Sequence, residues 1–147
     1  MNIVEIMDTD NDGILAVQLV TVLERLATSN SNVTTLEWCL LELEATGDLG
    51  PQWDWVSLNT AIDSSRQGLV LKWGDLYALA GKIIQTINAL IIGKKKDVTL
   101  QKSNWSQACE IAVEFIDSSV CRVSTGNPNV VAALQDSYRK VTVRSER

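Results

Sequence analysis

The sequence contains no histidine among its 147 residues. Histidine is the usual general base near neutral pH and the commonest metal ligand, so its absence removes Ser-His dyads, Cys-His dyads and histidine-containing zinc sites together. Phenylalanine and tyrosine are also scarce, with one Phe and two Tyr, whereas there are five Trp. These gaps argue against most catalytic classes and leave binding functions open.

The three cysteines, Cys39, Cys109 and Cys121, are far apart and form no Cys-x-x-Cys pair. This spacing indicates neither a zinc site nor a disulfide framework, and a reducing compartment fits best. The first residues contain no basic region followed by an apolar core, so we expect no secretory signal. The longest apolar stretch, Ile83 to Ile92, contains three polar residues and is about half as long as a bilayer span. We therefore expect a cytoplasmic protein with no membrane segment.

Hydrophobic residues make up 46% of the chain and charged residues 21%. Both values are typical of globular domains and unlike those of disordered or disulfide-rich chains. The length is close to the commonest domain size. We expect residues 1–147 to form a single globular domain.

Charge is distributed unevenly along the chain. Residues 1–65 contain eleven acidic residues and one basic residue, Arg25, whereas residues 66–147 contain twelve basic and seven acidic residues. Either the two parts interleave in the fold and offset one another, or the acidic part forms a face that attracts a basic partner. Nucleic acid is disfavoured as that partner, because the net charge is −5 and the one basic run, residues 94–96, has no aromatic neighbour for base stacking.

Three segments have the periodicity or the capping residues of helices. Apolar residues recur at intervals of three and four from Gly13 to Ala27 and again from Trp73 to Asn88. A third helix is expected from Pro128 to Val141, because Asn127 is placed to cap it and proline suits the first helical position. The helix at 73–88 has the broadest apolar stripe, so we expect it to pack at the centre of the fold.

Five segments are typical of strands: 36–44, 53–62, 90–92, 109–116 and 120–124. The last two are joined by Asp117-Ser118-Ser119 and predict a hairpin that places Ile111, Val113 and Phe115 on one face. Most strand pairs are joined by turns too short for a parallel crossover. The sequence therefore predicts an α+β fold, with an antiparallel or mixed sheet of about five strands and three helices packed mainly on one side.

An acidic motif precedes the first expected helix. Residues 8–13, Asp-Thr-Asp-Asn-Asp-Gly, resemble the first half of an EF-hand calcium loop, in which alternating oxygen ligands lead to a glycine. Leu19 stands at the twelfth position, where that family has a glutamate, and only seven residues precede the motif instead of an entering helix. We therefore expect Asp8, Asp10 and Asp12 to cap the first helix, and we assign no metal site.

Two of the tryptophans, Trp53 and Trp55, lie in a stretch from Leu26 to Ser65 without a basic residue. On the expected strand 53–62, both indoles point to one side. Tryptophan is frequent at interface anchor positions, and acidic surroundings suit lysine or arginine on a partner. The alternative is that both rings simply close the open end of the core. The candidate partner-binding residues are Glu42, Glu44, Asp48, Trp53, Asp54 and Trp55.

The sequence contains no recognisable catalytic constellation. Cys39 lies in an expected apolar strand, where a thiol packs rather than reacts. Cys109 and Cys121 lie on the two arms of the expected hairpin with no base nearby, and the sequence leaves open whether they pair as a disulfide. Residues 47–50 lack the spacing of nucleotide-binding loops. We assign no catalytic residue and no cofactor.

Together these features predict a non-enzymatic protein-interaction domain. A concrete version is an inhibitor or immunity-type protein that covers a basic site with its acidic, tryptophan-bearing face. We also expect self-association into a homo-oligomer. The alternative is a small-molecule or metal-responsive binding domain that uses Asp8, Asp10 and Asp12 or a pocket beneath the central helix.

Overall fold

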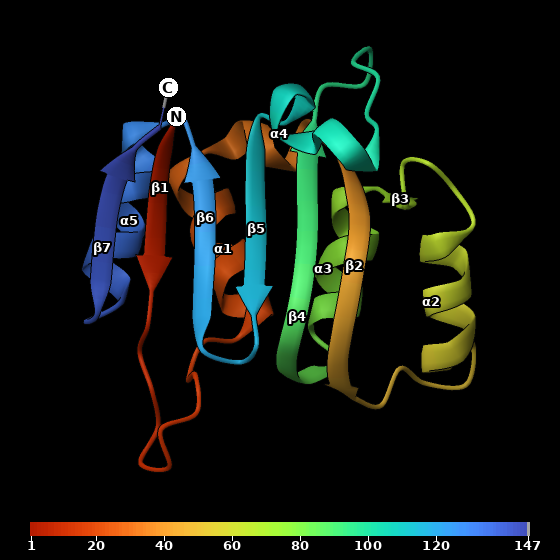
Figure 1. Ribbon diagram of the computed structural model, residues 1–147, viewed down its shortest axis with the longest axis horizontal. Helices are drawn as coiled ribbons and strands as arrows, with labels where there is room; N and C mark the ends of the chain where they lie inside the picture. The colour runs from red at the N-terminus through yellow and green to blue at the C-terminus, as the bar shows by residue number, and fades with distance from the viewer. Residues whose placement is uncertain (147) are drawn as a thin grey trace.

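In the computed structural model, which describes residues 1–146, the chain forms an antiparallel sheet with helices packed against it (Figure 1). The described residues contribute seven strands: β1 (Asn2–Ile6), β2 (Glu37–Gly47), β3 (Leu69–Leu71), β4 (Ile83–Lys94), β5 (Ile111–Ile116), β6 (Val120–Thr125) and β7 (Val141–Ser145). Their order across the sheet is β3-β2-β4-β5-β6-β1-β7, and every neighbouring pair is antiparallel. The predicted α+β class is confirmed, with more strands than the sequence indicated.

The described residues also form five α-helices and two short 3-10 helices. They are α1 (Leu19–Ser29), η1 (Ser31–Thr35), α2 (Trp55–Asp63), α3 (Trp73–Ala80), η2 (Lys102–Asn104), α4 (Trp105–Ala108) and α5 (Pro128–Ser137). Helices α1, α3 and α5 cover one face of the sheet, α4 lies on the other face, and α2 lies beside the sheet next to β2 (Figure 1). Among residues 1–146, no helix combines the length and apolar character needed to cross a bilayer.

Strand β1 is inserted between β6 and β7, so segments from opposite ends of the sequence lie side by side. Ile3 pairs with Ser124 on one side and with Arg144 on the other. Neither β1 nor β7 is predicted from the sequence. Each has only five residues, and β7 is mostly exposed, so neither has a long enough apolar alternation to be distinguished from a loop.

The first helix begins at Leu19, six residues later than Gly13, where the sequence predicts its start. Gly13 has φ 80°, in the left-handed region that glycine adopts without strain. The carboxylate of Asp10 accepts the N–H groups of Asp12 at 2.9 Å and Ile14 at 3.0 Å and so holds this turn. Gln18 is the N-cap residue and makes no side-chain hydrogen bond to the helix. The prediction that the aspartates cap this helix is therefore wrong.

Residues 55–63 form helix α2 instead of the predicted strand. Asp54 is the N-cap, and its carboxylate accepts the N–H of Ser57 at 2.7 Å. The buried residues Leu58 and Ile62 are four positions apart, a spacing that fits one helical turn and two strand repeats equally well. Because β3 pairs only with Trp38 to Leu40, α2 lies where the rest of β2 would present an unpaired edge.

The segment 73–88 is not one helix. Helix α3 ends at Ala80, Gly81 follows as its C-cap, and β4 begins at Ile83. The isoleucines of this segment stand at helical spacing, but β-branched residues also favour strands. Strand β4 pairs with β2 on one side and β5 on the other, so backbone hydrogen bonds to two neighbours outweigh the local helical pattern.

Three predicted elements are confirmed, and the first is the strand at 36–44, which corresponds to β2. Strands β5 and β6 form the hairpin, and its turn contains Asp117 and Ser118, both with positive φ. Helix α5 begins at Pro128, where the side chain of Asn127 accepts the N–H of Asn129 at 2.8 Å. This helix ends at Ser137, earlier than predicted, because the chain then turns into β7.

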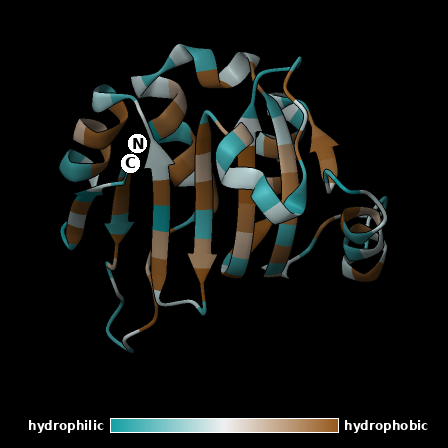
Figure 2. Ribbon diagram, turned by 45° about the horizontal axis from the view of Figure 1, so that its top comes forward, coloured by the Kyte–Doolittle hydropathy of each residue, from teal (hydrophilic) through white to brown (hydrophobic). Residues whose placement is uncertain are grey.

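The molecule has one large core and one small core, on opposite faces of the sheet. The large core lies between the sheet and helices α1, α3 and α5 and includes Leu23, Trp38, Ile91 and Phe115. The small core lies on the other face and consists of Cys39, Leu41, Ile92, Leu100 and Ala112. Hydrophobic and polar residues alternate along the strands, as expected for a sheet whose two faces differ in burial (Figure 2).

Candidate functional site

The candidate site lies on the sheet face opposite α1, α3 and α5, which we call the open face. Val4 and Ile6 of β1 belong to the large core, so the alternating residues Ile3 and Glu5 lie on the open face. The same alternation places Glu114 of β5 and Arg122 of β6 there. An antiparallel sheet commonly leaves one face in contact with solvent, and such a face can bind a partner without unfolding.

A segment from Lys95 to Cys109, which we call the covering segment, protects one end of the open face. Leu100, with the partly buried Trp105 and Ala108, packs on the small core over β2, β4 and β5. The segment is also tied to the end of α2, because the Lys102 ammonium donates to the carbonyl of Ile62 at 3.0 Å. The rest of the open face, towards β1, β6 and β7, has no such cover (Figure 1).

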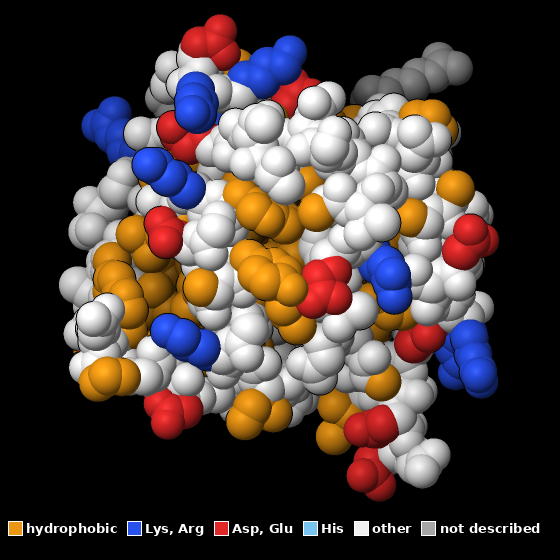
Figure 3. Space-filling view, turned by 180° about the vertical axis from the view of Figure 1, so that it is seen from behind, with side chains coloured by type: hydrophobic (Ala, Val, Ile, Leu, Met, Phe, Trp, Pro, Cys, Tyr) orange, Lys and Arg blue, Asp and Glu red, His pale blue; other side chains and the backbone are white. Residues whose placement is uncertain are grey.

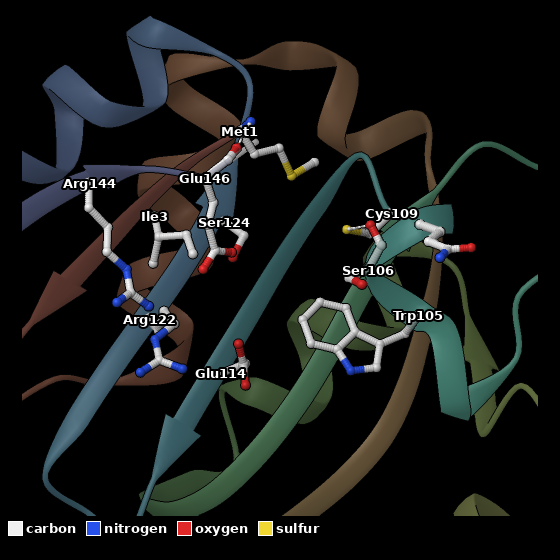
Figure 4. Close-up of a pocket in the computed structure, with 11 residues that line it drawn as sticks. Met1, Ile3, Trp105, Ser106, Cys109, Glu114, Arg122, Ser124, Arg144 and Glu146 are labelled. Atoms are coloured by element: carbon white, nitrogen blue, oxygen red, sulfur yellow. Dashed lines mark hydrogen bonds between the residues drawn. The ribbon is translucent and has the colours of Figure 1, made fainter.

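A hollow of about 480 Å³ lies beside the covering segment. Its floor includes Glu114, Arg122 and Ser124, and its sides include Trp105 and Arg144. Figure 4 shows the guanidinium groups of both arginines on one side, the Trp105 ring on the other, and the Glu114 carboxylate between them. The hollow therefore combines an aromatic wall with charges of both signs.

A row of charged side chains crosses three neighbouring strands at this hollow. Glu114 pairs in register with Arg122, and Arg122 pairs with Glu5 of β1. Arg122 Nη2 lies 3.4 Å from Glu5 Oε2, and Arg144 Nε lies 3.8 Å from Glu5 Oε1. Arg122 Nε is buried with no partner among the described residues. Both guanidinium groups thus share one carboxylate and keep most of their donors for another acceptor.

The carboxyl group of Glu114 on the open face is partly buried and has a raised pKa. Burial raises its pKa, the negative charge of Glu42 raises it further, and the positive charge of Arg122 opposes the rise. Its cross-strand neighbour Leu90 pairs in turn with Glu42 on β2. The acidic groups of β2 and β5 therefore lie close enough to repel each other.

Three glutamates, Glu5, Glu37 and Glu110, form ion pairs within residues 1–146, whereas Glu42 and Glu44 do not. Glu37 forms an ion pair of 2.9 Å with Lys94, and Glu110 lies 3.6 Å from Lys95. The pairing of Glu5 and Glu37 with bases from residues 66–147 confirms, for these two groups, that the acidic and basic parts of the chain interleave. Glu42 and Glu44 form no ion pair or side-chain hydrogen bond with any residue in the range 1–146. Their charge is available to a partner.

Of the six residues that the sequence assigns to partner binding, the structure brings three together. Glu42 and Glu44 are exposed on the open face, at β2. Trp55 is half-buried at its margin, where it lines a shallow hollow with Glu44 and Asn59. The Trp55 indole donates to the carbonyl of Gly47 at 3.0 Å, so α2 and the end of β2 fix its position.

The other three residues lie elsewhere. Asp48 accepts the N–H of Gly50 at 2.9 Å in the turn after β2, and Asp54 caps α2. Trp53 is 42% exposed and lines a separate hollow of about 340 Å³ with Leu58, Leu71 and Leu79. Hydrophobic side chains line a depression on this helix-bearing side of the molecule (Figure 3). Trp53 and Trp55 do not share a face, because residues 55–63 are helical.

The sequence analysis assigns no role to Glu114, Arg122, Arg144 or Trp105. The first two could have been found, because the predicted hairpin has Ile111, Val113 and Phe115 on one face. That assignment leaves Glu114 on the opposite face, and the hairpin register places Arg122 beside it. The face on which Arg144 lies could not be predicted, because the sequence does not predict β7.

The acidic motif near the start of the chain has a structural role. The Asp8 carboxylate accepts the N–H of Lys140 at 2.7 Å and that of Arg139 at 3.0 Å, which fixes the chain just before β7. Asp10 holds the turn at Gly13. Within residues 1–146, no three His, Cys, Asp or Glu side chains cluster as a metal site would require.

The three thiols are free and are not activated. Burial raises the pKa of Cys39 to about 11, and it also raises the pKa values of Cys109 and Cys121. Cys109 precedes β5 and contacts the small core, whereas Cys121 belongs to the large core on the other face. The two are therefore not neighbours across the hairpin. Cys39 is buried in β2, as the sequence predicts.

Comparisons with models of protein families, with curated proteins and with solved structures found no match to this chain. The function is therefore inferred from the geometry of the open face.

Proposed function

We propose that this protein is a non-enzymatic protein-interaction domain that binds a partner through the open face of its sheet. The observation that carries the proposal is the group of three glutamates, Glu42, Glu44 and Glu114, on one face and without an ion pair among the described residues. A partner that places lysine or arginine there gains attraction on approach and charge-assisted hydrogen bonds on contact. We call these three residues the acidic group.

The electrostatic environment supports a basic contact surface on the partner. Repulsion from Glu42 contributes to the raised pKa of Glu114, and a cation placed between them would relieve that repulsion. Trp55 lies beside Glu44 and adds a rigid aromatic surface at the margin. An inhibitor or immunity-type protein, which covers a basic site, uses the same combination of acidic steering and aromatic contact.

The available chemistry supports binding rather than catalysis. The thiols have raised pKa values and no base to activate them. The chain has no histidine. We also propose a reducing, cytoplasmic location, which is consistent with free thiols buried in both cores.

A second candidate function is small-molecule binding in the hollow beside Trp105. The supporting observation is the buried Nε of Arg122, which has no partner among the described residues. A ligand with a carboxylate and an apolar body would satisfy this donor and stack on the Trp105 ring. A rise in the melting temperature on addition of such a ligand, absent in Arg122→Lys, would favour this function over the first.

The test of the first function compares two triple variants that change the net charge equally. One carries Glu42→Gln, Glu44→Gln and Glu114→Gln in the acidic group. The control carries Asp12→Asn, Asp63→Asn and Asp136→Asn, three exposed aspartates whose side chains make no described hydrogen bond. Tagged protein is incubated with host lysate at low and high salt, and the retained proteins are quantified by mass spectrometry.

We expect wild type and control to retain the same basic protein at low salt, and the acidic-group variant to lose it. Equal retention by all three proteins would contradict a role for the acidic group. Equal loss by both variants would show that only the net charge matters, which would also contradict the proposal.

A further inference from the structure

The open face carries opposite charges on its two sides, and this division points to a specific partner. On the β2 and β5 side lie Glu42, Glu44 and Glu114, the acidic group. On the β6 and β7 side lie Arg122 and Arg144, which we call the basic pair. Strand β1, with Glu5, lies between β6 and β7, and its carboxylate satisfies only one contact of each arginine.

The shape of the open face is divided in the same way. The covering segment stands above the sheet over β2, β4 and β5, at the end where those strands carry the small core. The hollow of about 480 Å³ lies at the same end but on the side of β1, β6 and β7. A protrusion and a hollow therefore stand side by side across the strands, and Figure 4 shows the residues that line the hollow.

A single two-fold rotation pairs the acidic side of one copy with the basic side of the other, and the protrusion of one copy with the hollow of the other. A two-fold axis parallel to the strands, placed above the middle of the open face, turns a second copy over and exchanges its two sides. The acidic group of each copy then lies over the basic pair of the other, and each covering segment enters the partner's hollow. A two-fold interface of this kind is self-complementary, because every contact occurs twice.

We propose that the open face binds a second copy of this chain about this axis. The inference rests on the proposed function, because it identifies the partner of the acidic group. This axis leaves the strands of the two copies aligned, as they are in sheets that stack face to face.

The alternatives fit the charges less well. A two-fold axis across the strands would place the acidic group over itself and the basic pair over itself. A partner that is basic only opposite the acidic group would leave Arg122 and Arg144 without a counter-charge on the other side of the same face. The second copy is the partner that presents both charges in the required arrangement.

The size of the face limits the area that the contact can bury. The six strands from β2 to β7 in the sheet order are separated by roughly 4.8 Å each and so span about 24 Å. With about 20 Å of strand length, each copy contributes roughly 500 Å², which is at the low end for specific interfaces. The dimer should therefore dissociate on dilution and be sensitive to salt.

Charge reversal on both sides of the face gives the decisive test. One variant carries Glu42→Lys and Glu44→Lys, and the other carries Arg144→Glu; all three positions are exposed, so both proteins should fold. Arg122 is left unchanged because it is half-buried beside Glu5. Circular dichroism verifies the fold of each variant, and sedimentation velocity over a range of concentrations measures association.

We expect the wild type to dimerise, with weaker association at high salt, and each variant alone to be monomeric. Mixing the two variants should restore the dimer, because the new lysines then face the new glutamate while the second, unaltered contact is kept. A wild type that remains monomeric at its highest soluble concentration would overturn the inference. So would a dimer that neither variant weakens, or a mixture that stays monomeric.

The same proteins separate this inference from the function on which it rests. A monomeric wild type that still retains a basic host protein through the acidic group would overturn the dimer and keep the proposed function. A dimer that responds to charge reversal, with no host protein retained, would support the inference and show that the acidic group binds another copy of the chain instead of a foreign protein.

Discussion

The hairpin of β5 and β6 presents two different surfaces to the two sides of the sheet. Towards the helices it presents Val113, Phe115, Cys121 and Val123, each 2% exposed or less. Towards the open face the same strands present Glu114, Arg122 and Ser124 around a hollow. The first surface excludes water and carries the stability of the fold, whereas the second keeps charges partly hydrated and able to accept a partner. Successive residues of these strands therefore alternate between two roles: one set stabilises the fold, and the other is available to bind a partner.

The largest effect on stability should come from a substitution in the large core, on the helix-bearing side of the sheet. Phe115→Ala removes a buried ring from the large core and should lower the free energy of unfolding by about 3 to 5 kcal/mol. Glu114→Ala, at the adjacent position on the opposite face, should change it by no more than about 0.5 kcal/mol. Urea denaturation followed by tryptophan fluorescence measures both. Similar losses of stability in the two variants would show that the two faces contribute equally to the free energy of unfolding.

A smaller loss of stability is expected when a buried lysine on the open side of the sheet loses its counter-charge. Lys94 is 2% exposed and its ammonium lies 2.9 Å from Glu37, with the Lys95 carbonyl at 3.3 Å as a second acceptor. Glu37→Gln leaves this cation without a counter-charge and should lower the free energy of unfolding by roughly 2 to 4 kcal/mol.

The matched control for this pair is the double variant Glu37→Gln with Lys94→Met. It removes the buried cation as well, so most of the lost stability should return. Thermal and urea unfolding of the two variants give the difference. If the double variant is less stable than Glu37→Gln alone, the buried charge is not the cause of the loss.

Removing an unsatisfied polar atom from the helix-bearing side should have a small effect of opposite sign. The Tyr138 hydroxyl is buried without a partner among the described residues, and burial raises its pKa to about 12. Tyr138→Phe should therefore leave stability unchanged or raise it by up to about 1 kcal/mol. Tyr77→Phe, which removes an exposed bond of 2.7 Å to Glu24, should lower stability slightly. A clear loss in Tyr138→Phe would mean that the hydroxyl is hydrogen-bonded in solution.

The smallest effect concerns the pH dependence of the open face. Because the pKa of Glu114 is raised above its ordinary value of 4.5, the folded state binds this proton more tightly than the unfolded state. Stability contributed by the protonated group is therefore present at low pH and is lost as the pH rises through the folded pKa. Glu114→Gln cannot lose a proton, so its stability relative to wild type should increase as the pH rises. If the stabilities of the variant and the wild type changed with pH in parallel, the pKa of Glu114 would not be raised in the folded state.

Sequence reasoning succeeded where local and tertiary preferences agree. In the β5–β6 hairpin, Ile111, Val113 and Phe115 alternate, the turn residues tolerate positive φ, and the pairing is between sequence neighbours. At α5, Asn127 and Pro128 specify the start of the helix without help from the rest of the fold. These features need no information about distant residues.

It failed where distant pairing decides the structure. Ile83, Ile84 and Ile87 fit a helix by spacing, and only the presence of β2 and β5 on either side makes them a strand. The same limit applies to the candidate site. Glu42 and Glu44 were identified by charge alone, but their relation to Glu114 depends on a sheet order that the sequence does not reveal. Trp53 was grouped with Trp55 because Leu58 and Ile62 are spaced equally well for a strand.

The position of β1 has a consequence for how the protein is made. This strand is synthesised before the other described strands, yet its two neighbours, β6 and β7, are the last of the described strands to be synthesised. Until β6 has been synthesised, its apolar residues Ile3, Val4 and Ile6 therefore lack the strand with which they pair. The half of the sheet that carries the basic pair can be completed only after β7 has been synthesised, and such long-range pairing slows folding. The nascent chain must keep this strand from pairing with other molecules until then.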